Sequence, residues 1–272
     1  MRQLSKRIIT VGIALFVVCI EIFSQAEYFV IYADGNVRML IIDGAGRKLG
    51  YDPNTKTYFE QIPRSSIGAA GIDIVTDEGG ESDESQSNPV EAMIFDVVEG
   101  RYQIIVSGKS LSFFSLQFRT EYNNKGKTFE TGGIIDSAQT VSFNFTFTTT
   151  SGLVFEVERV ISSSTLRQDL AASFKLNLLG DKEFYKDLSK RLEKFERELA
   201  DKDSSKARHE LEKFGKKLEE VRKETIKNEE KKEKEEKKFI TADAYQILQE
   251  DVNTLLKQLP AKKKGEKDEE DD

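Results

Sequence analysis

The chain has 272 residues, a formal net charge of −7 at pH 7 and 33% charged residues. This acidic balance excludes a strongly basic surface for nucleic acid. The only cysteine is Cys19, so the chain cannot form an internal disulfide bond, and packing must hold the fold together.

Residues 1–26 have the three parts of an export signal. A basic start is followed by a nearly continuous apolar run, Ile8–Ile20, and then by the small residues of Ser24-Gln25-Ala26. The basic residues are Arg2, Lys6 and Arg7. We predict cleavage after Ala26 and a secreted, periplasmic or cell-surface location.

Two alternatives to cleavage fit the sequence less well. An uncleaved membrane anchor needs about 20 apolar residues, whereas Glu21 ends the apolar run that begins at Ile8. If the segment stayed uncleaved, it would be the chain's only contact with a membrane. Lipidation of Cys19 normally requires a small preceding residue, and Val18 stands there. The lack of disulfides in an exported chain of this size favours a bacterial source.

Composition divides the rest of the chain. Phe, Val, Ile, Thr, Ser and Gly dominate up to about Ile161, and Lys, Glu and Leu dominate from Asp181 onward. We predict a β-domain over residues 27–165, a linker over 166–180 and a helical module over 181–259. Residues 260–272 form a tail that is too charged to fold.

Alternating apolar residues predict strands in the first domain. Val141, Phe143, Phe145 and Phe147 alternate with polar residues, which places the four side chains on one face of a strand. Further strands are expected at Tyr28–Tyr32, Val37–Ile42, Ala92–Val97, Tyr102–Val106, Phe114–Phe118 and Leu153–Val157. Short strands separated by turn residues favour an antiparallel β-sandwich over a parallel sheet.

The segment Asp96–Gly108, followed by Phe114–Phe118, has a Gly-x-Tyr step into a strand, a polar turn and a second aromatic strand. It resembles the closing hairpin of the immunoglobulin-like or jelly-roll accessory domains of bacterial secreted enzymes. The resemblance covers a short stretch and implies a sandwich without implying a ligand.

A glycine-rich segment, Asp43–Pro53, is followed by Gln61-Ile62-Pro63. The glycines permit sharp turns and the prolines fix φ, so we predict a turn before a short hairpin. A phosphate-binding loop is the alternative, but the sequence lacks the Gly-Lys-Ser/Thr ending of such a loop.

Acidic residues gather in the polar stretch Asp77–Asn88. Its carboxylates are the candidate ligands for a calcium ion, which takes six to eight oxygen ligands. They are Asp77, Glu78, Glu81, Asp83 and Glu84. Their spacing is not that of an EF-hand loop, so a mobile solvated loop is the favoured interpretation. We predict no cofactor.

Three apolar stripes with helical spacing follow. They consist of Phe184, Leu188, Leu192, Phe195 and Leu199, then Ala207, Leu211, Phe214, Leu218 and Val221, and finally Ala244, Leu248, Val252, Leu255 and Leu259. Three such helices bury their stripes by packing together, which predicts a three-helix bundle. Each stripe is too short to favour a coiled-coil oligomer.

The polar segments between the stripes fit this division. Asp201–Ser205 provides a turn, Thr241 is a candidate N-cap, and Pro260 ends the third helix. The charged run Asn228–Lys238 could extend the second helix or form a flexible linker. We favour helical extension followed by a frayed loop.

The helical module resembles FIMAH, a small helical domain near the C-termini of many exported bacterial proteins. The resemblance lies in all three helices. In the first helix it is carried by Leu188, Leu192 and Leu199, and in the second by Ala207–Leu218. In the last it is carried by Ile240–Leu248, followed by Leu255, Leu256 and Leu259. In that family a similar Ala-Asp motif opens the last helix and the module serves association. The Lys/Glu tract before the last helix departs from the family pattern, and the resemblance identifies no partner.

The residues that most hydrolases need are missing from the sequence. His209 is the only histidine, it is expected on the solvent side of its helix, and no Gly-x-Ser-x-Gly motif occurs. We therefore predict no catalytic residues, no enzyme activity and no metal site beyond the calcium candidates.

We expect a noncatalytic exported bacterial protein that mediates binding or adhesion at the cell envelope or outside the cell. The β-sandwich would bind the ligand, an envelope or extracellular protein or glycan, and the helical module would serve as the docking element. The alternatives are a periplasmic chaperone or assembly factor, which an unprotected edge strand would favour, and a carbohydrate-acting enzyme accessory.

Overall fold

The structure of the chain is a computed structural model, which describes residues 28–69, 89–122, 125–148, 154–231 and 238–260. The chain divides into two compact units. The β unit comprises Met1–Ser107, Phe114–Gly132 and Ser142–Arg159. The helical unit comprises Val160–Asp272 with the short segments Gly108–Phe113 and Gly133–Val141.

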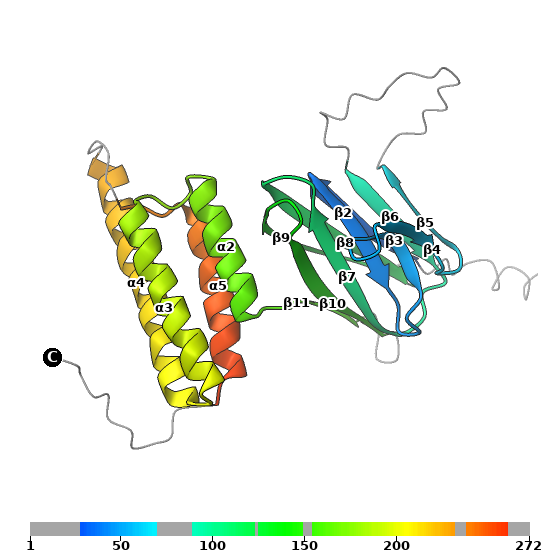
Figure 1. Cartoon of the computed structure of the whole chain (residues 1–272). Helices are drawn as coiled ribbons and strands as arrows, with labels where there is room; N and C mark the ends of the chain where they lie inside the picture. Colours follow the sequence, from blue (N-terminus) through cyan, green and yellow to red (C-terminus); the bar gives the residue numbers. More distant parts are fainter. Residues whose placement is uncertain (1–27, 70–88, 123–124, 149–153, 232–237, 261–272) are drawn as a thin grey trace, which may run out of the picture. The chain divides into compact units, whose positions relative to one another are not determined.

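Two antiparallel sheets form the first part of the fold (Figure 1). The 5-stranded sheet has the order β5-β6-β1-β8-β9, and the 6-stranded sheet has the order β11-β10-β7-β2-β3-β4. The strands are β1 Tyr28–Gly35, β2 Val37–Ile42, β3 Lys48–Asp52, β4 Thr57–Glu60, β5 Ser65–Ala69, β6 Val90–Phe95, β7 Gly100–Gly108, β8 Ser112–Tyr122, β9 Lys125–Ile135, β10 Thr140–Thr148 and β11 Val154–Arg159.

Aromatic side chains fill the space between the two sheets. Phe29 of β1 stacks on Phe145 of β10 with ring centroids 4.3 Å apart, and Phe114 of β8 meets the edge of Phe143. Phe29, Phe143 and Phe145 are fully buried, and burial of such a side chain stabilises the fold by about 1.5–3 kcal/mol. The apolar side chains of residues 141–147 therefore lie on one face of β10, as the sequence predicts, and face the other sheet.

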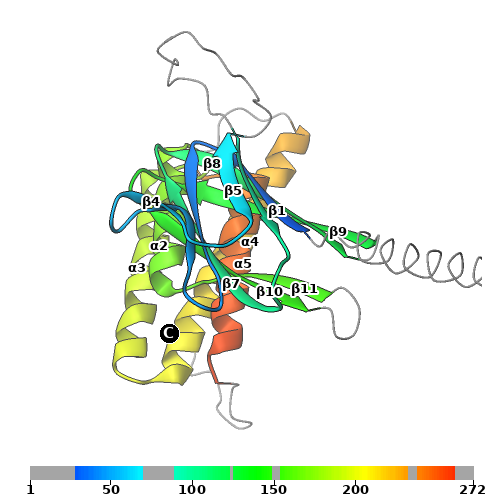
Figure 2. The ribbon, with the colours of Figure 1, turned by 90° about the vertical axis from the view of Figure 1, so that its right-hand side faces the viewer.

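All seven strands predicted from the sequence are present, and the turn after Ile42 precedes a β3–β4 hairpin, as predicted. Figure 2 shows the hairpin of β10 and β11, in which Phe145 pairs with Val157. The long strand β9 was not predicted. Its residues Gly126–Glu130 are exposed, so no apolar alternation marks it in the sequence.

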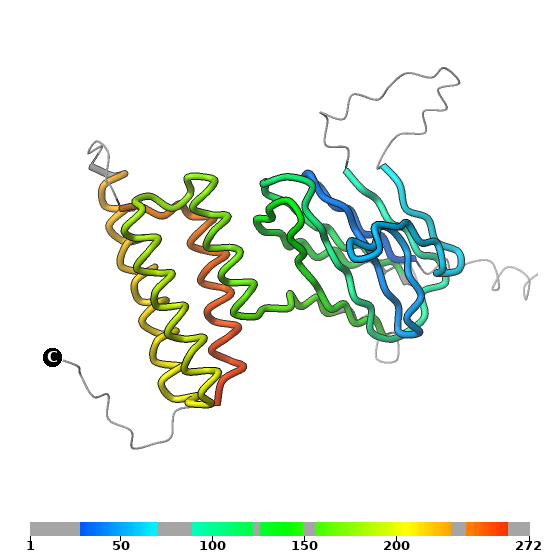
Figure 3. The backbone as a smooth tube through the Cα atoms, in the orientation of Figure 1, coloured from blue at the N-terminus to red at the C-terminus, as the bar shows by residue number. Residues whose placement is uncertain are grey.

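Four helices form the second part of the fold, and consecutive helices run in opposite directions (Figure 3). They are α2 Ser163–Lys175, α3 Lys182–Ala200, α4 Ser204–Lys231 and α5 Ala242–Gln258. One buried apolar cluster extends through all four and includes Leu166, Leu188, Phe214 and Leu248. The three predicted stripes supply most of it, although Leu199 is 42% exposed.

The prediction of three helices is wrong by one, because α2 occupies most of residues 166–180, where we expected a linker. The Ser162 hydroxyl caps this helix by accepting a hydrogen bond from the Thr165 backbone N–H. Leu166 and Leu170 of α2 are buried in the helical core. The helical module therefore begins about 20 residues before the predicted boundary at 181.

The predicted helix ends agree with the structure. Thr241 caps α5 through its hydroxyl, which accepts a hydrogen bond from the Ala244 N–H, and α5 ends just before Pro260. The polar turn after Ala200 separates α3 from α4. The charged run from Asn228 is helical to Lys231, as favoured, and residues 232–237 lie outside the described part.

Side chains of α4 hold both ends of α5. Arg208 donates hydrogen bonds to the carbonyl oxygens of Leu256 and Leu259 at 2.8 Å, and thereby satisfies the free carbonyls at the end of α5. Arg222 donates to the Ile240 carbonyl at 3.0 Å, just before α5 begins. These contacts attach both ends of α5 to α4.

Among the described residues, no helix has the length and apolar composition required to cross a membrane.

Candidate functional site

Each unit has a surface hollow, and we call the first the sheet-end hollow. It has a volume of ≈ 160 Å³. The β2–β3 turn, the loop between β4 and β5, the end of β6 and the start of β7 supply its walls. Its lining residues are Asp43, Arg47, Ile62, Pro63, Arg64, Ile94, Phe95, Asp96, Val98 and Tyr102.

The Asp43 carboxylate organises one wall of the sheet-end hollow. It accepts hydrogen bonds from the backbone N–H groups of Ala45 and Arg47 at 3.0 and 2.9 Å, and from Arg47 Nε at 2.6 Å. Gly46 has a φ of +79°, which favours glycine. Since a carboxylate of the chain already occupies these N–H groups, the turn does not offer them to a phosphate.

The floor of this hollow is apolar and its rim is mixed. Ile62, Ile94 and Tyr102 are buried at its base, whereas Val98 is 63% exposed at its edge. The Tyr102 hydroxyl donates to the Val98 carbonyl oxygen at 2.8 Å, and burial raises the pKa of that hydroxyl above its ordinary value. The loop that carries Val98 is therefore tied to the sheet.

The ion pair between Arg64 and Asp96 and the aromatic ring of Phe95 complete the rim. Arg64 pairs with Asp96, and both side chains remain more than half exposed. Phe95, next to Asp96, is 37% exposed. Exposed apolar side chains beside a buried apolar floor form a surface that can receive an apolar group from a partner.

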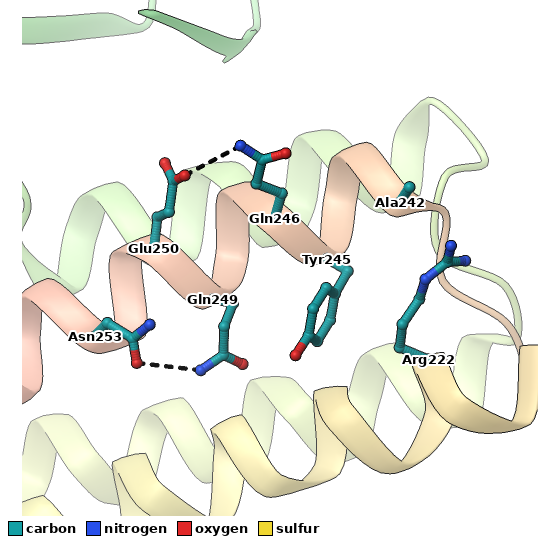
Figure 4. A pocket seen from close by; sticks show the side chains of 7 residues that line it. All are labelled: Arg222, Ala242, Tyr245, Gln246, Gln249, Glu250 and Asn253. Atoms are coloured by element: carbon teal, nitrogen blue, oxygen red, sulfur yellow. Dashed lines mark hydrogen bonds between the residues drawn. The ribbon is translucent and has the colours of Figure 1, made fainter. Parts of the chain in front are cut away.

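We call the second hollow the α4/α5 groove. It has a volume of ≈ 330 Å³ and lies beside α5, with Arg222 of α4 on its opposite side (Figure 4). Its lining residues are Arg222, Ala242, Tyr245, Gln246, Gln249, Glu250 and Asn253. Apart from Ala242, all of these side chains carry a hydrogen-bonding group.

Two hydrogen bonds link the polar side chains of α5 at i, i+4 spacing. Gln246 Nε2 donates to Glu250 Oε1, and Gln249 Nε2 donates to Asn253 Oδ1, both at 3.2 Å (Figure 4). The charged groups at the groove also have partners, because Arg222 binds the Ile240 carbonyl and lies 3.7 Å from Glu229.

The side-chain oxygen of Gln249 is buried and accepts no hydrogen bond within the described residues. A buried acceptor without a donor costs about 1–3 kcal/mol. Gly215 of α4 lies directly opposite, since a Cβ there would be 3.6 Å from Gln249 Nε2. The Gln249 amide therefore lies between the two helices, against Gly215.

The sheet edges differ in their protection against pairing with another strand. Among the described edge strands, β9 carries Lys127, β11 carries Glu156 and Glu158, and β4 ends with Glu60. Strand β5, with the sequence SSIGA, has neither charge nor proline. Charged residues and proline are the usual means by which an edge strand avoids such pairing, so β5 is the least protected of these edges.

The structure places few of the residues that the sequence singles out for chemistry. The calcium candidates Asp77, Glu78, Glu81, Asp83 and Glu84 lie outside the described residues, as do the export signal and the tail after Pro260. His209 is half-buried rather than fully solvent-facing. Within the described ranges, no three acidic, histidine or cysteine side chains gather in a way that could hold a metal ion.

Neither hollow was predicted from the sequence. The spacing of Tyr245, Gln249 and Asn253 at every fourth residue is a signal that could have identified the groove. The sheet-end hollow joins residues far apart in the chain, so no local pattern marks it.

Comparisons with protein-family models, with curated proteins and with solved structures found no match for this chain. The resemblances to the FIMAH module and to immunoglobulin-like accessory domains therefore stay predictions.

Proposed function

We propose that the chain is a noncatalytic exported bacterial binding protein, which holds a protein partner of the envelope or extracellular space at the sheet-end hollow. The helical unit serves as its docking element. This proposal retains an immunoglobulin-like sandwich and the FIMAH-like role of the helices as predictions.

The size and lining of the sheet-end hollow carry the proposal. Its volume of ≈ 160 Å³ is below the roughly 300–1,000 Å³ of typical small-molecule and cofactor sites. A space of this size with a buried apolar floor suits one apolar side chain of a partner. Such an anchor in a desolvated pocket supplies much of the binding energy in protein interfaces.

The rim supports a protein partner over a glycan. Phe95 and Val98 offer apolar contact, and the Arg64–Asp96 pair offers charged groups that a polar interface rim can use. A glycan site would need a broad aromatic platform, and the chain has no tryptophan.

The test is affinity capture from envelope and secreted fractions of the source cells with the mature full chain. Val98→Asp places a charge at the edge of the hollow and is expected to reduce retention of the specific partner at least tenfold. Tyr58→Asp is the matched control, because Tyr58 is 66% exposed on β4 and does not line the hollow. Equal retention by both variants would contradict a site at the hollow.

The second candidate is a chaperone or assembly factor, which the uncharged edge of β5 favours. A client strand would pair with this edge through main-chain hydrogen bonds. Ser66→Lys puts a charge on the exposed edge. If it abolishes capture while Val98→Asp does not, strand addition at β5 replaces the hollow as the binding mode.

A further inference from the structure

We propose that the protein held at the sheet-end hollow is a second copy of this chain. Two copies pair about a two-fold axis, and Val98 of each copy enters the hollow of the other. This inference rests on the proposed function, because it uses the same hollow and names the partner that occupies it.

A projection and a recess lie side by side on this surface. Val98 is exposed at the edge of the hollow. The buried side chains of Ile62, Ile94 and Tyr102 form the floor. The Tyr102 hydroxyl donates to the Val98 carbonyl oxygen at 2.8 Å and holds the main chain of the projection in place. In a two-fold interface the same patch of both copies meets, so a projection beside a recess fits its own rotated copy.

The charged groups of the rim are also complementary to their own copy. Arg64 and Asp96 form an ion pair and are both more than half exposed. Across a two-fold axis, if residue i contacts residue j, then j also contacts i. Arg64 of each copy therefore meets Asp96 of the other. Asp43 and Arg47, the other charged residues of the lining, pair with each other, so the patch has no net charge that would keep two copies apart.

The backbone presents the two rim charges at fixed positions. Arg64 and Asp96 have φ values of +50° and +53°, in the left-handed region that residues other than glycine rarely adopt. The Phe95 N–H donates to the Arg64 carbonyl oxygen at 2.9 Å, which joins the two positions. Strained conformations of this kind cluster at binding sites, where the surrounding structure holds them. Charged side chains at two such neighbouring positions support contact with a partner at this rim.

Pairing also removes exposed apolar surface from water on both sides. Phe95 and Val98 are exposed in each copy, and the two-fold contact covers both of them. A different protein would have to provide an apolar anchor beside one basic and one acidic group in the matching arrangement, whereas a second copy brings all three. Because the hollow is small, we expect a weak dimer with a dissociation constant in the micromolar range.

The first experiment measures the mass of the mature full chain by sedimentation equilibrium at increasing concentration. We expect a reversible monomer–dimer equilibrium, which Val98→Asp weakens at least about tenfold, because the introduced charge would have to enter an apolar hollow. Tyr58→Asp is the matched control and is expected to dimerise as the unsubstituted chain does, since Tyr58 is exposed and does not line the hollow. Circular dichroism checks that both variants are folded. A chain that stays monomeric, or a dimer that Val98→Asp leaves intact, would overturn the inference.

The second experiment reverses the charges at the rim. Arg64→Glu leaves two acidic groups there and Asp96→Arg leaves two basic groups, so each variant alone is expected to dimerise at least about tenfold more weakly. An equimolar mixture of the two variants is expected to restore dimers, because the introduced glutamate then meets the introduced arginine, and the unchanged Asp96 meets the unchanged Arg64. A mixture as monomeric as its components would contradict pairing between these residues across the interface.

The results separate this inference from the proposed function. If affinity capture retains a different protein through Val98 while the chain itself is monomeric, the proposed function stands and the inference fails. If Ser66→Lys abolishes the dimer and Val98→Asp does not, the copies pair through the edge of β5 and the inference fails as well. A monomeric chain whose capture of other proteins is unchanged by Val98→Asp contradicts both.

Discussion

Gly180 lies where the chain leaves α2 and meets the segment that enters α5. Its N–H donates to the Phe239 carbonyl at 2.9 Å, and Thr241 N–H donates to the Leu178 carbonyl at the same distance. A Cβ at residue 180 would lie 2.1 Å from the Phe239 ring. These backbone bonds hold the Phe239 backbone beside residue 180, so the ring can make room for a Cβ only by rotating away from its position.

We therefore expect Gly180→Ala to destabilise the helical unit by about 1–3 kcal/mol, the usual cost of overpacking. Gly215→Ala is the control, because its Cβ would lie 3.2 Å from Val252 Cγ1, a contact that a shift of a few tenths of an ångström relieves, and alanine gains about 1 kcal/mol of helix propensity. Urea unfolding followed by circular dichroism measures both variants. A Gly180→Ala protein as stable as the Gly215→Ala protein would show that Phe239 moves freely.

Asp52 makes the stability of the β unit dependent on pH. The side chain is almost fully buried at the β3–β4 turn, where it accepts from Lys48 Nζ at 2.7 Å and from the Asn54 N–H at 2.9 Å. The hydrogen bond from Lys48, followed by the one from Asn54, holds the pKa of the Asp52 carboxyl below its ordinary value of 3.8. Its lowered pKa means that folding favours the ionised form.

The stabilisation by Asp52 is therefore present above pH 3.8 and is lost as the pH falls from that value through the lower folded pKa. We expect Asp52→Asn to lower the melting temperature at pH 7 and to lower it progressively less as the pH falls below 4. Calorimetry of both proteins at several pH values tests this. A difference that stays constant down to pH 2 would mean that the charge of Asp52 does not stabilise the fold.

The helices that the sequence predicts are those with uninterrupted apolar stripes. In α3, the buried residues are Phe184, Leu188, Leu192 and Phe195, and all are apolar. The buried face of α2 instead includes Asp169 and Ser173 beside Leu166 and Leu170. Polar residues on a buried face hide the helical period, which is why this segment looks like a linker in the sequence.

The same reasoning explains the strands and the hollows. Strands buried on one face, such as β10, alternate visibly, whereas β9 has an exposed first half and two successive glycines, Gly132 and Gly133. The sheet-end hollow depends on Asp43, Arg64 and Val98, which only the folded sheets bring together. Local periodicity can predict an element, but it cannot predict which loops meet at the end of a sheet.

At the scale of the whole molecule, the separate apolar core of the helices implies that they can fold without the strands, including the strand segments Gly108–Phe113 and Gly133–Val141 that belong to the helical unit. The buried apolar cluster of the helices extends from Ile161 to Leu255 and includes no residue of the β unit. We therefore expect a Val160–Asp272 fragment to fold as a helical protein with one cooperative thermal transition. A fragment that is unfolded by circular dichroism would show that the strands contribute to its stability.

A shorter fragment, Leu176–Asp272, tests whether three helices suffice, as the sequence predicts, or whether α2 is required. Its loss removes Leu166 and Leu170, both buried in the core, and uncovers the faces of α3 and α5 against which α2 packs. Burial of two leucine side chains contributes about 3–6 kcal/mol, a large share of the stability of a small domain. We expect the shorter fragment to melt at a much lower temperature than the longer one, or to be unfolded at 25 °C, whereas equal melting temperatures would mean that the three-helix bundle is complete without α2.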